Sequence, residues 1–303
     1  MDIQYFKYKE LLSMPIRRAA YSDRTAWLMA EMAKLAYIKF ENNEVEKRSL
    51  IEGLKKADFL LVNVFNYEGT QAFLALREKD KMLVLAFRGT EQKSLRDIIS
   101  DLDARYYKDE NGVKIHNGFL KGFQRIEKEI RQSISNYTDF ALYVSGHSLG
   151  GALALIATRA LNSDNLAACY TFGSPKVGNS DFGDSIKPPI YRVVNDLDPV
   201  PFLPFTYLWE AVYWLARKFK IEKLVEFVAK MRGYAHHGDL RFLPACGSDL
   251  SNARAVTDCN DLIRFASFLN IKIPKWKEIA SDHAIDLYCE KLAHWALKRL
   301  EAE

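Results

Sequence analysis

The sequence predicts an α/β protein in which helices cover both faces of a mostly parallel sheet. Apolar runs of strand length alternate along the chain with longer segments that repeat apolar residues at helical spacing. This alternation is typical of parallel sheets, because two parallel strands are usually joined by a helix that packs on the sheet. The 303 residues are 49% hydrophobic, enough for one large core, so we expect a single domain over residues 1–303.

The elements are expected in a regular order along the chain. Helical spacing of apolar residues comes first, and runs of strand-forming residues follow it. The predicted helices are residues 24–37, 46–57, 94–104, 120–134 and one from the turn at Ser148 to about residue 162. The predicted strands are residues 59–65, 71–77, 81–87, 140–145, 166–174 and 189–195, with a brief strand or loop at 113–119.

The stretch LYVSGHSLGGALALIATRA (142–160) places a serine at a strand-to-helix corner. Gly146, Ser148 and Gly150 fit the Gly-x-Ser-x-Gly nucleophile elbow. The glycines leave no Cβ to clash where strand and helix nearly touch, and the start of the helix directs free N–H groups at the serine. An inert serine in a glycine-rich turn is the alternative. The strand before it and the helix after it favour a nucleophile.

A serine nucleophile needs a base and an acid to orient that base, and in this type of site the acid precedes the histidine in the chain. The acid is expected directly after strand 189–195, where strand geometry leaves both Asp196 and Asp198 open. The histidines further along the chain are His236, His237, His283 and His294. His283 comes just before a helix with apolar residues on one face, a position that can present a side chain into a cleft.

Two backbone N–H groups are needed to stabilise the oxyanion that forms during acyl transfer. Leu149, the residue after the nucleophile, is expected to supply one of them. The buried strand 81–87 leads into Gly89, which lets the chain bend, and then into Thr90. Thr90 is therefore expected to supply the second N–H.

Residues 202–232 differ from the rest of the chain. Their first half holds six aromatic residues, and their second half has six Lys or Arg against two Glu. An aromatic, basic, amphipathic helix is typical of a membrane interface. A helix that packs on the core with its charges in solvent is the alternative, and the sequence leaves both open.

Taken together, these segments resemble the class 3, or fungal-type, lipases of the α/β-hydrolase superfamily. The matching segments are AFRGT (86–90), HNGF (116–119), GHSLGGALA (146–154), TFGSPKVGN (171–179), RVVNDLDPVPFLP (192–204) and DHAIDLY (282–288). They occur in the family's order and cover about residues 60–300. The resemblance implies an α/β-hydrolase fold.

The resemblance also implies a role for each site residue. It identifies Ser148 as the nucleophile, Asp198 rather than Asp196 as the acid, His283 as the base, and Thr90 and Leu149 as the oxyanion donors. The helix at 94–104 takes the place of the family's lid, although it is more polar than the lid of a typical secreted fungal lipase. The segment 202–232 is longer than the link expected after the acid.

The expected function is a serine carboxylester hydrolase of the acylglycerol lipase type, which cleaves lipid acyl esters through an acyl-enzyme on Ser148. This function implies no metal or organic cofactor. The basic half of 202–232 favours phospholipase A1 activity at anionic membranes as an alternative. A membrane-surface binding protein without catalysis on the same fold is a second alternative, from a different class. Nothing in the sequence indicates peptide recognition.

Net charge and targeting patterns limit the classes of partner and the cellular location that we expect. A net charge of +4 is too weak to argue for nucleic acid. No apolar run approaches the roughly 20 residues that span a bilayer, and the first residues lack a signal-peptide pattern. We expect a cytoplasmic protein, or one exported without such a signal, with contact to a membrane surface through 202–232. Cys246 and Cys259 flank a polar loop and are the pair that oxidation would join.

Overall fold

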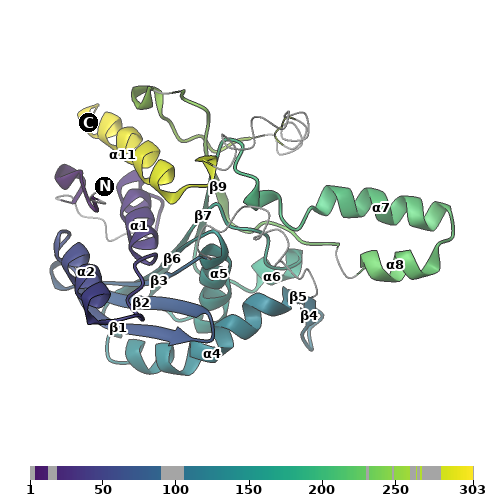
Figure 1. The fold of residues 1–303 in the computed structure, drawn as a ribbon, viewed down its shortest axis with the longest axis horizontal. Helices are drawn as coiled ribbons and strands as arrows, with labels where there is room; N and C mark the ends of the chain where they lie inside the picture. Colours follow the sequence, from purple (N-terminus) through teal and green to yellow (C-terminus); the bar gives the residue numbers. More distant parts are fainter. Residues whose placement is uncertain are drawn as a thin grey trace.

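A mostly parallel sheet forms the centre of the molecule, as the sequence predicts (Figure 1). The computed structural model describes residues 4–12, 19–89, 106–229, 232–247, 249–259 and 281–302, together with Arg264 and Ser267. The described residues form a seven-stranded sheet in the order β1-β2-β3-β6-β7-β8-β9. The strands are β1 (Leu60–Tyr67), β2 (Thr70–Arg77), β3 (Met82–Phe87), β6 (Ala141–His147), β7 (Leu166–Phe172), β8 (Ile190–Asn195) and β9 (Asp239–Leu243).

Antiparallel strand pairs occur at only one edge of this sheet. β3, β6, β7, β8 and β9 are parallel to one another, whereas β1, β2 and β3 pair antiparallel. β4 (Tyr106–Lys108) and β5 (Lys114–His116) form a separate small hairpin. The carboxyl ends of the parallel strands therefore meet along one edge, which is where active sites of open α/β sheets lie.

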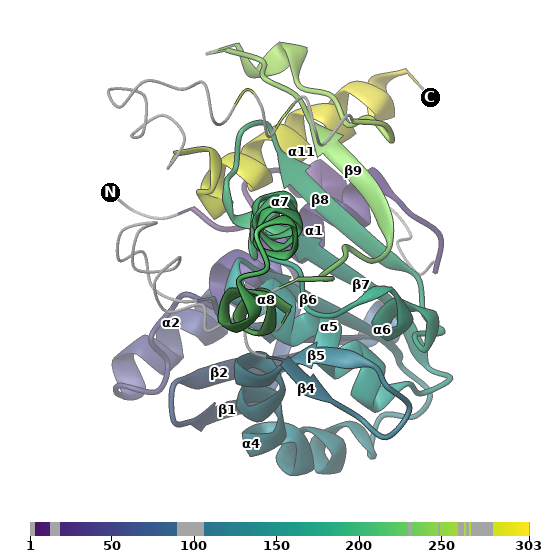
Figure 2. The ribbon, with the colours of Figure 1, turned by 90° about the vertical axis from the view of Figure 1, so that its right-hand side faces the viewer.

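Helices cover both faces of the sheet (Figure 2). One apolar layer contains the buried side chains of α1 (Asp23–Leu35), α2 (Glu44–Lys55) and α11 (Ile285–Glu301). The opposite layer contains those of α4 (Asn117–Ile134), α5 (Leu149–Leu161) and α6 (Ser180–Asp184). All six side chains of β3 are buried, which explains why this strand is a continuous apolar run rather than an alternating one.

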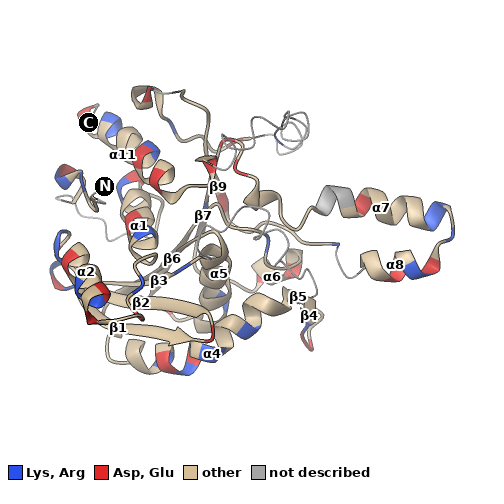
Figure 3. Ribbon diagram, in the orientation of Figure 1, with Lys and Arg blue, Asp and Glu red and all other residues tan. Residues whose placement is uncertain are grey.

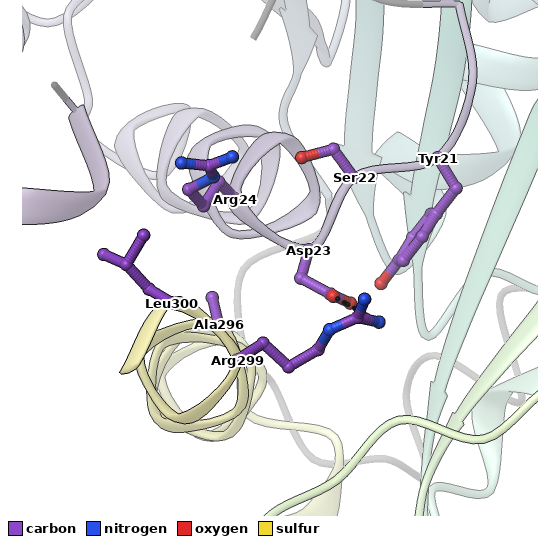
Figure 4. A pocket seen from close by; sticks show the side chains of 7 residues that line it. All are labelled: Tyr21, Ser22, Asp23, Arg24, Ala296, Arg299 and Leu300. Carbon is purple, nitrogen blue, oxygen red and sulfur yellow. Dashed lines mark ion pairs between the residues drawn. The ribbon is translucent and has the colours of Figure 1, made fainter. Parts of the chain in front are cut away.

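The apolar residues of these helices are spaced so that they face the core. In α4 the side chains of Phe119, Phe123, Ile126 and Ile130 are buried, and their spacing places them on one face of the helix. Helix α11 packs against α1, and polar contacts fix the end of this seam (Figure 4). There Trp295 Nε1 donates to Asp23 at 3.0 Å, and Arg299 forms an ion pair with Asp23.

Helices α7 (Thr206–Lys218) and α8 (Glu222–Ala229) form an antiparallel pair that extends away from the sheet (Figure 1). Residues 206–229 of the segment 202–232 thus form a projecting hairpin, which differs from the alternative of a helix packed on the core. No helix within the described ranges has the length and apolar character needed to cross a bilayer.

The structure departs from the sequence prediction at several element ends. Helix α4 begins at Asn117 rather than at residue 120, because the His116 side chain accepts the N–H of Phe119 as an N-cap. β7 ends at Phe172 because Gly173 turns the chain with φ +55°. β9, which the sequence analysis missed, is a short edge strand of mixed polarity. All four cysteines are free, Cys246 and Cys259 included.

Candidate active site

Ser148 lies in a strained turn between β6 and α5. Its backbone has φ +57° and ψ −130°, a conformation that costs energy for any residue other than glycine. The surroundings hold it there, since the N–H of Ser148 donates to the carbonyl of Phe172 at 2.9 Å. A Cβ on Gly146 would overlap the carbonyl group of Gly150, so the tight approach of strand and helix requires glycine. This turn matches the nucleophile elbow that the sequence predicts.

The side chain of His283 joins Ser148 to Asp198. Its Nε2 lies 2.9 Å from Ser148 Oγ, and its Nδ1 lies 2.9 Å from both carboxylate oxygens of Asp198. A carboxylate can only accept, so Nδ1 carries the proton and donates to Asp198. The lone pair of Nε2 then faces the serine hydroxyl, which is the tautomer that a general base needs.

Asp198 is fully buried and held by two further donors. Its Oδ1 accepts the N–H of Val200 at 2.9 Å, and its Oδ2 accepts the hydroxyl of Tyr288 at 2.6 Å. Burial and the nearby Asp198 raise the pKa of Tyr288 well above its usual value, so the phenol stays protonated and donates. The carboxylate is thereby fixed opposite His283.

Asp196, the alternative acid, makes different contacts. Its N–H donates to the carbonyl of Leu243 on β9, and its own carbonyl accepts from Arg264. Burial raises the pKa of its carboxyl group. Of the two aspartates that the strand ending left open, Asp198 is the one that contacts His283.

His147, the neighbour of the serine, holds the backbone of His283. Its Nε2 lies 2.7 Å from the carbonyl oxygen of His283, and its Nδ1 lies 2.8 Å from the hydroxyl of Tyr37. Because a carbonyl only accepts, Nε2 donates to it and Nδ1 accepts from Tyr37. Burial, and secondarily the charge of His283, lowers the pKa of His147 well below its usual value. His147 is therefore a neutral positioning residue.

A buried lysine, Lys291, supports Asp282, the residue before His283, through the side chain of Asn195. Asn195 Nδ2 donates to the carbonyl of Asp282 at 2.8 Å, and Lys291 Nζ donates to Asn195 Oδ1 at 2.6 Å and to the carbonyl of Pro244 at 3.0 Å. The backbone carbonyls of Asp282 and His283 are thus each held by a side-chain donor, Asn195 for the first and His147 for the second. Sequence reasoning missed this support. Its one visible signal was a lysine on the apolar face of a helix, three residues after Tyr288.

Of the two oxyanion donors that the sequence predicts, the structure describes only Leu149. Leu149 is the first residue of α5. The N–H groups at the start of a helix have no carbonyl partner within the helix, and those of α5 face the end of β6. Gly89 lies directly beside Ser148, since a Cβ there would approach Ser148 Cβ to 3.1 Å. Thr90 and the predicted lid at 94–104 lie outside the described residues.

A cavity of about 450 Å³ adjoins this position. Gly89 and Leu149 contribute to its wall beside Ser148, and Phe119 and Leu153 add apolar surface. Charged side chains, including Arg88 and Arg125, also line it. The cavity therefore combines an apolar wall next to Ser148 with charged groups.

The other candidate histidines are engaged elsewhere. His236 Nε2 donates to the carbonyl of Pro201 at 2.7 Å, and His237 packs against the ring of Phe182. His294 contacts Tyr8 at the surface of α11. Within the described ranges, no group of His, Cys, Asp and Glu is arranged to hold a metal ion.

Comparison with known proteins finds similarity to lipases. Residues 84–208 match the model of the lipase (class 3) family. The lipase of Rhizomucor miehei is 34% identical over 151 residues, which is 45% of this chain and 41% of the relative. The secreted mono- and diacylglycerol lipase 1 of Fusarium solani is 38% identical over 117 residues, 34% of this chain and 35% of the relative. Residues 84–208 of this chain are therefore similar to class 3 lipases.

The similarity in fold extends beyond the region that is aligned in sequence. Lipase II from Rhizopus niveus superposes with a TM-score of 0.60 at 22% identity, covering 83% of this chain and 94% of that one. The α/β-hydrolase fold predicted from the sequence is thereby confirmed. In sequence, the matched region spans less than half the length of the curated relatives.

Proposed function

We propose that this chain is a class 3 lipase, a serine carboxylester hydrolase that cleaves lipid acyl esters through an acyl-enzyme on Ser148. The observation that carries the proposal is the hydrogen-bonded line from Ser148 through His283 to Asp198, with the imidazole in the tautomer of a base. A triacylglycerol lipase with a similar fold has a serine-protease triad as its catalytic centre, which supports the same assignment here.

The geometry supports a two-stage reaction. Ser148 Oγ attacks the ester carbonyl carbon while its proton passes to His283 Nε2, and Asp198 stabilises the imidazolium that forms. The tetrahedral intermediate collapses, the carbon–oxygen bond to the alcohol breaks, and the alcohol takes the proton from His283. Water then attacks the acyl-enzyme by the same route, which releases the fatty acid and restores the serine.

In this proposal the N–H groups of Leu149 and Thr90 bind the oxyanion. The start of α5 adds a favourable field, because the N-terminal end of a helix attracts negative charge. Loss of one such donor lowers kcat by about a hundred- to a thousand-fold in enzymes of this kind.

The proposed substrates are acylglycerols, which is the substrate class that several relatives' names state. The apolar wall of the cavity beside Leu149 suits an acyl chain. Phospholipase A1 activity at anionic membranes is the second candidate. It is favoured by the projecting hairpin within 202–232, which carries exposed apolar and basic side chains. We propose that this segment is a cap or insertion within a single domain and that it contacts a lipid interface.

Product analysis tests this proposal. The wild-type protein and Ser148→Ala are incubated with triacylglycerol, with phosphatidylglycerol and with a soluble short-chain ester, and released fatty acid is measured. We expect acylglycerol hydrolysis that Ser148→Ala abolishes. Faster release from the phospholipid would favour phospholipase A1, and cleavage of the soluble ester alone would leave an esterase. No hydrolysis of any ester would contradict the proposal.

A further inference from the structure

The outer end of the α7–α8 hairpin concentrates exposed apolar side chains. We define the hairpin tip as residues 214–227. The described residues expose nine large apolar side chains, and five of them lie in this tip: Trp214, Leu215, Phe219, Ile221 and Phe227. Trp214 is 61% exposed and Phe219 is 66% exposed. Apolar side chains gathered in this way on a projecting element mark a contact surface.

Basic positions, with acidic ones beside them in α8, lie among the same apolar residues at the outer end of the hairpin (Figure 3). The hairpin tip contains four Lys or Arg and two Glu, a net charge of +2: Arg217, Lys218, Lys220, Lys223, Glu222 and Glu226. Lys218 Nζ lies 5.1 Å from the ring centre of Trp214. Long basic side chains can lie along apolar groups while their charge faces outward, so one surface offers both kinds of contact.

The two helices of the hairpin pack against each other. Ala216 and Val228 are buried between the two helices, and the rings of Trp209 and Phe227 meet edge to face. Its exposed side chains are therefore presented by an ordered element, and an ordered element loses little conformational entropy when it binds.

The base of the hairpin is tied back to the chain that leaves it. Arg232 forms an ion pair with Glu210 and lies 3.9 Å from the ring centre of Tyr213. Together with the seam between the helices, these contacts leave the hairpin tip as the end that projects from the molecule (Figure 1).

We propose that the hairpin tip docks on the surface of an anionic phospholipid bilayer. Aromatic and aliphatic side chains would enter the region between head groups and acyl chains, while the basic residues pair with lipid phosphates. A second copy of the chain fits less well, because two tips of charge +2 would repel each other. The inference rests on the proposed function only in that a lipid surface is where the substrate is found.

Vesicle binding by the full-length chain tests the proposal separately from catalysis. Binding is measured on the Ser148→Ala background, with vesicles of phosphatidylcholine alone and of phosphatidylcholine mixed with phosphatidylglycerol. One variant adds Phe219→Ser and Ile221→Ser, and another adds Lys218→Gln, Lys220→Gln and Lys223→Gln. The matched control adds Val45→Ser and Leu60→Ser, which remove exposed apolar groups outside the hairpin.

The variants should separate the apolar from the electrostatic contribution. Loss of Phe219 and Ile221 should weaken binding to both kinds of vesicle by about tenfold or more. Each lysine removed should weaken binding to the anionic vesicles by about fivefold and leave binding to neutral vesicles unchanged. Raised salt should reduce the preference for anionic lipid, because it screens exposed charges. The control should bind like the parent.

Three results would overturn the proposal: no binding of the parent, equal binding by the Phe219 and Ile221 variant, or self-association in sedimentation that the same variant abolishes. The last result would identify the hairpin tip as an interface between copies. Turnover of a soluble ester, measured with Ser148 present, should be equal in all variants and shows that they fold. Vesicle binding without any ester turnover would refute the proposed function and leave this inference standing.

Discussion

Removing the hydroxyl of Tyr288 tests whether the acid of the site is held as the geometry indicates. In the native protein this hydroxyl donates to Asp198 Oδ2 at 2.6 Å and accepts the N–H of Asn195 at 3.0 Å, and all three residues are buried. The substitution Tyr288→Phe keeps the ring and its packing. It removes one donor from a buried carboxylate and one acceptor from a buried N–H group.

The expected magnitude follows from these two contacts. A hydrogen bond to a charged group contributes about 1.5–3 kcal/mol, and a buried N–H left without an acceptor costs about 1–3 kcal/mol. Since such contributions are not fully additive, we expect the free energy of unfolding to fall by about 3 kcal/mol. Asp198 would be held less firmly against His283, so kcat should fall by about tenfold with KM nearly unchanged.

Urea unfolding and steady-state hydrolysis of a soluble ester measure the two effects. Tyr67→Phe is the matched control, because the Tyr67 side chain is 52% exposed and its hydroxyl should contribute less than about 0.5 kcal/mol. A Tyr288→Phe protein with the stability and kcat of the wild type would refute the reasoning. Equal losses in both variants would point to a general effect of removing a hydroxyl.

Three further substitutions test separate parts of the structure. Burial raises the pKa of Glu31 from about 4.5 in the unfolded chain to about 7 in the folded protein. The protonated side chain therefore stabilises the folded state fully below about pH 4.5, and this stabilisation is lost as the pH rises through about 7. Glu31→Gln should therefore raise the unfolding free energy at about pH 8 by up to about 3 kcal/mol and flatten its pH dependence in urea titrations. Gly146→Ala should cost about 3 kcal/mol in the same assay and abolish ester turnover, because its Cβ would overlap Gly150. Lys291→Met leaves Asn195 Oδ1 without its donor and should lower kcat by about tenfold at constant KM; unchanged kcat would show that the loop carrying His283 needs no such support.

Much of the site could be predicted from the sequence because its geometry is local or follows strand order. The glycines on either side of Ser148 and the change from strand to helix specify the elbow. Parallel strands bring the residues after β8 beside the elbow, which predicted an acid at Asp196 or Asp198. The resemblance to class 3 lipases selected Asp198, and the structure places Asp198 against His283.

The supporting contacts could not be predicted because they join segments far apart in the chain. Lys291 and Asn195 are 96 residues apart, and His147 and Tyr37 are 110 apart. Periodicity reports which face of a helix is buried and does not identify the atom that it meets. For the same reason the pattern in 202–232 predicted an amphipathic helix and left open whether it lies at a membrane interface or packs on the core.

The most direct test of the central claim is labelling of the intact protein with a fluorophosphonate. Such a reagent phosphonylates a serine only where a base activates the hydroxyl and an oxyanion site stabilises the adduct. Mass spectrometry should find one phosphonyl group, on the peptide that contains Ser148, and none after Ser148→Ala. An unlabelled wild-type protein, or equal labelling of Ser148→Ala, would contradict the account.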